Sequence, residues 1–150
     1  MTILHAERIL QHLQTICTPA ALGVTTVERN YPYALGSDQV PFVGINQISD
    51  APLLKDGPAN LEFNDWDLQV EFLIATKSST LPVDTALNAI RAALHLTLFT
   101  DYTQAGNCYN TVARDVTIEV KEGTKADSPA AVMKCVFSFI YRTKITDPTF

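Results

Sequence analysis

The chain has 150 residues, of which 47% are hydrophobic and 18% are charged, and its formal net charge is −5. This composition is typical of a folded globular domain and excludes wholesale disorder, and the dispersed Lys and Arg residues disfavour a nucleic-acid binder, which needs clustered positive charge. No apolar run approaches the roughly 20 residues that span a bilayer, and the N-terminus M-T-I-L-H-A-E-R lacks the pattern of a signal peptide. We therefore expect one soluble, intracellular domain covering residues 1–150.

The first 48 residues predict a helix followed by two strands. Residues 3–17 place their apolar side chains at the three-and-four spacing of one helix face, with Thr2 as the expected N-cap and with Pro19 and Gly23 ending the helix. A short strand over residues 23–30 and a second over 40–48 should follow. In the second strand, Pro41 indicates the start and Gly44 indicates a bulge or a close approach.

The segment 66–75 has the clearest strand pattern in the chain. Its apolar residues on one side begin with Trp66 and continue at every second position, whereas the other side carries more polar residues. We therefore expect Trp66 to lie in the core.

The second half of the chain predicts a helix and a hairpin. Thr80 is the expected cap of a helix that runs from Pro82 to about residue 99, with Pro82 in its first turn. Strands are expected over 111–121 and 131–143, the first with Val112, Val116, Ile118 and Val120 in alternation, and joined by the polar loop E-G-T-K-A-D-S-P. This order of elements predicts an α+β fold with a single, mainly antiparallel sheet and two principal helices packed on one face.

A long arm, residues 49–65, separates two of the predicted strands. A hairpin needs only two to five connecting residues, yet this segment is longer, contains Pro and Gly, and retains several large apolar residues. It can order against a partner protein, or it can fold onto its own domain as an Ω-loop. The first interpretation makes the following residues a candidate assembly interface: Leu53, Leu54, Lys55, Asp56, Leu61, Glu62 and Phe63.

The sequence contains no pattern that points to catalysis, a metal or a cofactor. Cys17, Cys108 and Cys135 are odd in number and widely spaced, which is typical of free structural thiols in a reducing compartment. The spacing of His5, His12 and His95 matches no common metal motif, and a Cys108–His95 pair is conceivable but has no local support. The carboxylates Glu62, Asp65, Asp67 and Glu71 are expected to form a solvated acidic face, although two or three of them could bind a cation.

The chain resembles the bacteriophage tail terminators, small proteins that cap the tail tube and join it to the head. The resemblance covers nearly the whole chain as an order of elements: an N-terminal amphipathic helix, then V-E-R-N-Y-P and V-P-F-V-G-I, the strand D-W-D-L-Q-V-E-F-L-I-A-T, the helix P-V-D-T-A-L-N-A-I-R-A-A-L, and the strands R-D-V-T-I-E-V and V-F-S-F-I-Y-R-T.

This resemblance implies a structural virion protein without catalysis or cofactor. Such a protein forms a hexameric ring on the head-proximal end of the tube, ends tube elongation, and contacts the tube protein and a head-completion protein after assembly in the host cytoplasm. Three alternatives remain open from the sequence: another head–tail connector or neck protein, a small-ligand-binding domain with a pocket between the sheet and the helix 82–99, and, last, an enzyme.

Overall fold

The computed structural model describes residues 2–30, 40–53, 62–78, 81–121 and 130–149. Its elements are α1 (His5–Ile16), α2 (Pro19–Leu22), β1 (Thr26–Arg29), β2 (Phe42–Pro52), β3 (Phe63–Lys77), α3 (Val83–Phe99), β4 (Asn110–Lys121) and β5 (Ala130–Lys144). The strands form one sheet in the order β1-β2-β3-β5-β4. Only β1 and β2 are parallel; the other pairs are antiparallel. The predicted α+β fold with a mainly antiparallel sheet is confirmed.

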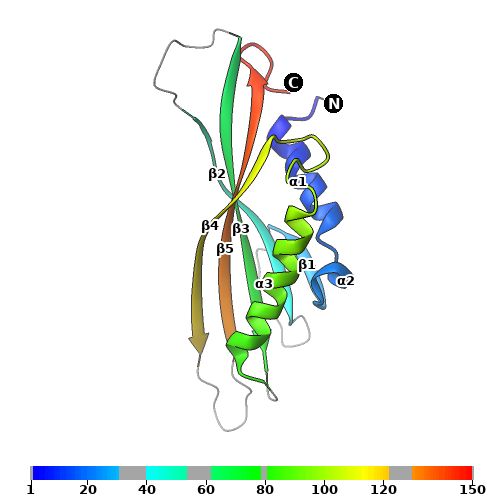
Figure 1. Cartoon of the computed structure of the whole chain (residues 1–150), viewed down its shortest axis with the longest axis vertical. Coiled ribbons are helices and arrows are strands. Elements are labelled where there is room, and N and C mark those ends of the chain that lie inside the picture. The colour runs from blue at the N-terminus through cyan, green and yellow to red at the C-terminus, as the bar shows by residue number, and fades with distance from the viewer. Residues whose placement is uncertain (1, 31–39, 54–61, 79–80, 122–129, 150) are drawn as a thin grey trace.

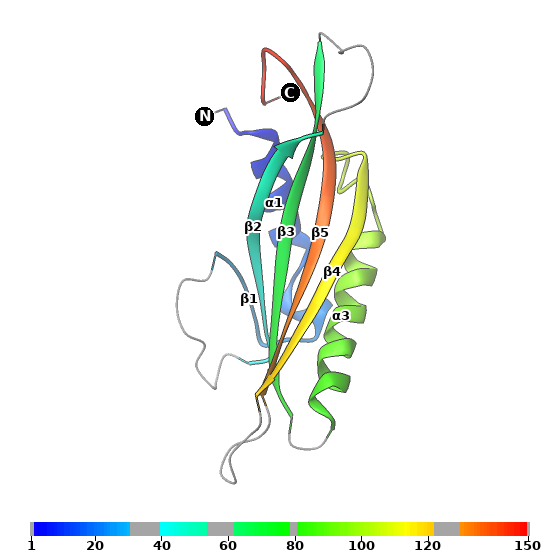
Figure 2. The same ribbon diagram turned by 90° about the vertical axis from the view of Figure 1, so that its left-hand side faces the viewer.

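The helices of the described structure lie on one face of the sheet (Figure 1). Figure 2 shows α1 behind β2 and β3 and α3 beside β4, and α3 also packs on β3 and β5. The core between the layers is apolar and closely packed, and its fully buried members include Ile9, Leu10, Leu13, Ile45, Leu68, Phe72, Ile74, Leu87, Leu94 and Phe139. These are the positions that the helical and alternating patterns predict, because each element buries one face.

The beginning of the chain differs from the prediction at its caps. Leu4, and not Thr2, occupies the N-cap position of α1, without a side-chain cap hydrogen bond. Pro19 begins the short helix α2, whose first turn is capped by the Thr18 hydroxyl accepting from the Ala21 N–H. Proline suits this position because the first helical N–H groups have no intrahelical partner. Gly23 then ends α2 in the left-handed conformation, at φ 67°.

Both ends of the predicted long arm belong to strands, residues 49–52 to β2 and residues 63–65 to β3. β2 continues to Pro52, which pairs with Trp66, and β3 already begins at Phe63, so only residues 53–62 connect the two strands. The predicted bounds of the arm, residues 49–65, are therefore wrong, because the strands on both sides extend into it. Pro52 is tolerated as the last residue of β2, which β1 flanks only at residues 42–45.

Two strands contain irregularities that the alternating patterns did not locate. At Gly44 the expected close approach is confirmed, since an added Cβ would lie 3.1 Å from Cε1 of Phe42, but the bulge in β2 falls between Gln47 and Ser49. In β4 a bulge between Ala113 and Val116 places Val112 on the opposite face from Val116, which corrects the predicted alternation.

The helix α3 buries the predicted face through Leu87, Ile90, Leu94 and Leu98. Pro82 is its N-cap and lies just before the first turn. Thr80 and the polar loop 122–129 lie outside the described residues.

Candidate assembly surface

One end of the molecule brings together segments that are far apart in the sequence. The end of β2, the start of β3 and the end of β5 are paired there, close to the start of α1 (Figure 1). The Leu53 N–H donates to the Asp65 carbonyl at 2.8 Å, and the Ile145 N–H donates to the Glu62 carbonyl at 2.9 Å. The His5 N–H donates to the Pro148 carbonyl, which fixes the start of α1 at the same place. We call this region the hairpin end.

The hairpin end exposes large apolar side chains. Leu4, Leu53, Tyr109 and Ile145 are 55%, 39%, 47% and 49% exposed. Each of the four flanks a helix or strand; Leu53 and Ile145 are held by the hydrogen bonds above, and the Tyr109 N–H donates to the Ile140 carbonyl at 2.8 Å. Exposed apolar residues that gather in one place are typical of contact surfaces.

On the face of the sheet away from the helices, an ion pair with aromatic neighbours anchors this end. Arg142 of β5 donates to both carboxylate oxygens of Asp65 on β3, at 2.6 and 3.2 Å. The Arg142 guanidinium lies 5.9 Å from the ring centre of Phe63 and 6.0 Å from that of Tyr109. Hydrogen bonding to Asp65 raises the pKa of Arg142, and burial, followed by the charge of Asp65, raises the pKa of Tyr109. The cluster links β3, β5 and the residue before β4.

On the helix side of the same strands, Tyr141 lies between two rings. His5 stacks on it at 4.9 Å and Trp66 at 6.5 Å, measured between ring centroids. The Tyr141 hydroxyl contacts both carboxylate oxygens of Asp50, at 3.0 and 2.8 Å, and the Trp66 indole N–H donates to Thr143 at 3.1 Å. Burial is the main cause that raises the pKa of Asp50, while the Tyr141 hydrogen bond opposes it. The two clusters fix both faces of the hairpin end.

Trp66 shares the helix-side face with Leu68, as predicted, but it is only partly buried. The prediction of a core position is therefore only partly correct. The helical layer covers the middle of the sheet, whereas Trp66 lies near the start of β3, where Tyr141 and Thr143 cover part of it.

The predicted interface residues are only partly within the described structure. Leu53 and Glu62 are exposed at the hairpin end, and Phe63 is half-buried beside Arg142. Four others lie outside the described residues: Leu54, Lys55, Asp56 and Leu61. Sequence reasoning missed two residues of this end, Tyr109 and Arg142. The one available signal was the dipeptide R-T at the end of β5, because the alternation of that strand places Arg142 on the face opposite its apolar residues.

The predicted solvated acidic face is wrong for two of its four members. Asp65 and Asp67 are 6% and 9% exposed, whereas Glu62 is exposed and Glu71 half-buried. The bulge in β4 directs Arg114 across β5, so that its Nε donates to Ser138 at 2.9 Å and its Nη2 lies 3.7 Å from Asp67. Within the described ranges, no group of three His, Cys, Asp or Glu residues is arranged to hold a metal ion.

The three cysteines are buried and free, as predicted. Burial raises the pKa of Cys17 to about 12 and that of Cys108 to about 11, which leaves little thiolate for nucleophilic attack. The Cys108 sulfur contacts the Tyr102 carbonyl at 3.4 Å and the Thr111 hydroxyl at 3.8 Å, while His95 stacks on Phe99 at 4.4 Å. These contacts give no support to the conceivable Cys108–His95 pair.

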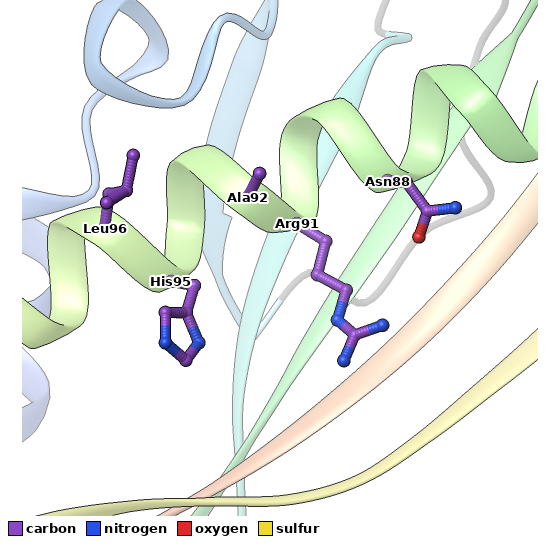
Figure 3. Close-up of a pocket in the computed structure, with 5 residues that line it drawn as sticks. All are labelled: Asn88, Arg91, Ala92, His95 and Leu96. Atoms are coloured by element: carbon purple, nitrogen blue, oxygen red, sulfur yellow. The ribbon is translucent and has the colours of Figure 1, made fainter.

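A shallow hollow of about 490 Å³ lies on the outer surface of α3. Its lining comes from Asn88, Arg91, Ala92, His95 and Leu96 (Figure 3). All five belong to one helix, so within the described part of the chain the hollow has no opposing wall. It is therefore a surface groove and differs from the pocket between sheet and helix that a ligand-binding domain would need.

The part of the chain that the structure describes contains no helix that is long and apolar enough to cross a membrane. No family model matches the sequence, and no curated protein is significantly similar to it. The functional assignment must therefore come from the residues and the geometry of the chain itself.

Proposed function

We propose that the protein is a structural virion component, a tail terminator. In this role, several copies form a hexameric ring on the head-proximal end of a phage tail tube. The ring ends tube elongation and presents a surface for joining the head. Its partners are further copies of the same chain, the tail tube protein and a head-completion protein, and the role needs neither a cofactor nor catalysis.

The observation that carries this proposal is the hairpin end. It exposes Leu4, Leu53, Tyr109 and Ile145 to solvent, and Figure 2 shows that the start of β3 and the end of β5 form one end of an elongated sheet. A capping protein needs a contact surface at an end of its fold, because its partners lie above and below the ring. Burying such side chains against a partner contributes roughly 25 cal/mol for each Å² of apolar surface removed from water.

The rigidity of this end supports the same role. The Asp65–Arg142 pair and the Tyr141–Asp50 hydrogen bonds connect three strands, one cluster on each face of the sheet. A surface that is already ordered loses less conformational entropy when it binds, so more of the contact energy remains as affinity. Together with the family resemblance in the order of elements, this ordered surface favours an assembly role. It also favours contact through the hairpin end itself over contact through a segment that becomes ordered only on binding.

The rival functions have less support. A neck protein at another position in the head–tail junction would use the same surface, and only its place in assembly distinguishes it. A small-ligand-binding domain would need an enclosed site, whereas the hollow on α3 is lined by one helix. An enzyme would need an activated group, and burial raises the pKa of all three thiols.

Charge substitution at the hairpin end tests the proposal. Leu53→Asp and Tyr109→Asp each place a carboxylate on the proposed contact surface, where desolvation of the charge opposes binding. In a phage whose own copy of the gene is disrupted, the wild-type protein should restore tails of uniform length, and both variants should fail to do so. Electron microscopy of tail lengths is the measurement.

Leu81→Asp is the matched control, since Leu81 is 58% exposed and precedes α3, whose start lies at the opposite end of the molecule (Figure 1). This variant should restore tail length. Uniform tails that remain unattached to heads when the protein is missing would favour the neck-protein alternative. Full activity of both hairpin-end variants would contradict the proposed surface.

A further inference from the structure

The outer surface of α3 combines a charge without an ion pair and an exposed aliphatic side chain. Within the described residues, Arg91 forms no ion pair, although the chain as a whole has a net charge of −5. Leu96 is 70% exposed, the largest exposed fraction among the large hydrophobic residues described. Figure 3 shows Arg91 and His95 projecting from one side of the helix, and Ala92 and Leu96 from the other side. Arginine is enriched in binding hot spots, where the neighbouring contacts exclude water from it.

The opposite flank of the molecule has complementary features. Glu28 is exposed on β1, an edge strand, and forms no ion pair with any described residue. Its neighbour Arg29 is neutralised, because both of its terminal nitrogens bond to Glu7 at 2.7 Å. On β2, beyond the short stretch that β1 covers, Ile48 is 48% exposed. This flank therefore offers an acidic and an aliphatic group.

We infer that the outer surface of α3 in one subunit contacts the β1 flank of a second copy, with Arg91 meeting Glu28. This inference rests on the proposed ring, for which it names the two faces in contact. Figure 2 shows β1 and α3 on opposite flanks of the sheet. A contact between two different faces of the same chain is heterologous, and it generates a closed ring when its rotation closes.

A second copy fits the hollow better than a small anion does. A small anion on a groove lined by one helix would keep most of its surface in water and gain little from Arg91. A neighbouring protein surface can cover Leu96 and Arg91 together, and the β1 flank supplies an apolar and an acidic group for them. The charge pair would chiefly set the register and the choice of partner face, because exposed pairs contribute little to affinity but like charges in contact are strongly unfavourable.

Charge reversal with rescue tests this contact. Sedimentation velocity over a concentration series gives the midpoint of self-association for the wild-type protein and for Arg91→Glu, Glu28→Arg and the double variant. Each single reversal should raise the midpoint concentration about tenfold or more, since it places like charges opposite each other. The double variant should return to within about threefold of wild type, because the pair is restored with its charges exchanged. Lys77→Glu is the control: it makes the same charge change at the end of β3 and should leave the midpoint unchanged.

The outcomes separate this inference from the proposed function. Wild-type association in both single variants, or a double variant no better than the singles, would overturn the contact, as would a wild-type protein that stays monomeric at every concentration. If those variants still restore uniform tails, the terminator role stands and only the assignment of the faces fails. If the double variant rescues self-association but the wild-type protein does not set tail length, the contact stands and the terminator role fails.

Discussion

Replacing Tyr141 by Phe should destabilise the protein in a pH-dependent manner. The Tyr141 hydroxyl lies 3.0 and 2.8 Å from the two carboxylate oxygens of the half-buried Asp50, and Tyr141 itself is 4% exposed. The substitution removes this hydrogen bond and leaves the ring in place between His5 and Trp66. Because the ring and its stacking are kept, the measured loss reports mainly on the hydroxyl.

The magnitude follows from the charged acceptor. A hydrogen bond to a charged group contributes about 1.5–3 kcal/mol, and the partial solvation of Asp50 favours the lower end, about 1.5 kcal/mol at pH 7. In a domain of this size, that corresponds to a decrease in Tm of about 3–6 °C.

The pH dependence has a definite sign. Burial raises the pKa of Asp50 in the folded protein above its ordinary value of 3.8, so the folded state binds the proton more tightly than the unfolded state. Stability therefore falls as the pH rises through this region. Loss of the Tyr141 hydrogen bond, which lowers the pKa of Asp50, should raise that pKa further and deepen the fall. The difference between variant and wild type should consequently shrink on acidification toward pH 4.

Urea unfolding followed by circular dichroism at several pH values is the assay. Tyr102→Phe is the matched control, since Tyr102 is 56% exposed and its hydroxyl has no described partner, so its cost should stay below about 0.5 kcal/mol. A cost for Tyr141→Phe as small as that of the control, or one that grows on acidification, would refute the reasoning.

Three further outcomes are expected. Arg142→Met should lower the free energy of unfolding by about 2 kcal/mol, because it leaves the nearly buried Asp65 carboxylate without its charged partner; Asp65→Asn combined with Arg142→Met should recover part of this loss in urea titrations, and additive losses would contradict it. All three thiols should react with a thiol reagent only on unfolding, since all are buried; fast labelling of the native protein at pH 7 would count against this. Replacing residues 54–61 by a short Gly/Ser connector should preserve cooperative unfolding, because the pairing of Pro52 with Trp66 and of Phe63 with Lys144 lies outside the replaced segment; loss of the folded state would show that the replaced residues are needed for it.

The sequence by itself determined which segments form the sheet and the helical layer. The helix faces of α1 and α3 and the alternation in β3 and β5 are local patterns, because each element has to bury one side and the period of the backbone fixes which residues lie there. Burial of Cys17 and Cys135 followed from the same patterns, whereas Cys108 lies between α3 and β4 and has no such pattern. The α+β class then followed from the order of elements.

Only the tertiary structure decided where the strands end and which charges meet. Residues 49–52 lack an alternating pattern, yet they pair with β3 because the ladder continues along a partner already in place. The bulge in β4 turns Arg114 toward Asp67, and the register of β3 with β5 sets Arg142 opposite Asp65. Such pairings depend on register between strands that are far apart in the sequence, and no local pattern encodes register across that distance. For this reason Asp65 and Asp67, which the sequence predicted to lie on a solvated face, are buried beside Arg142 and Arg114. The surface at the hairpin end likewise combines residues from both halves of the chain.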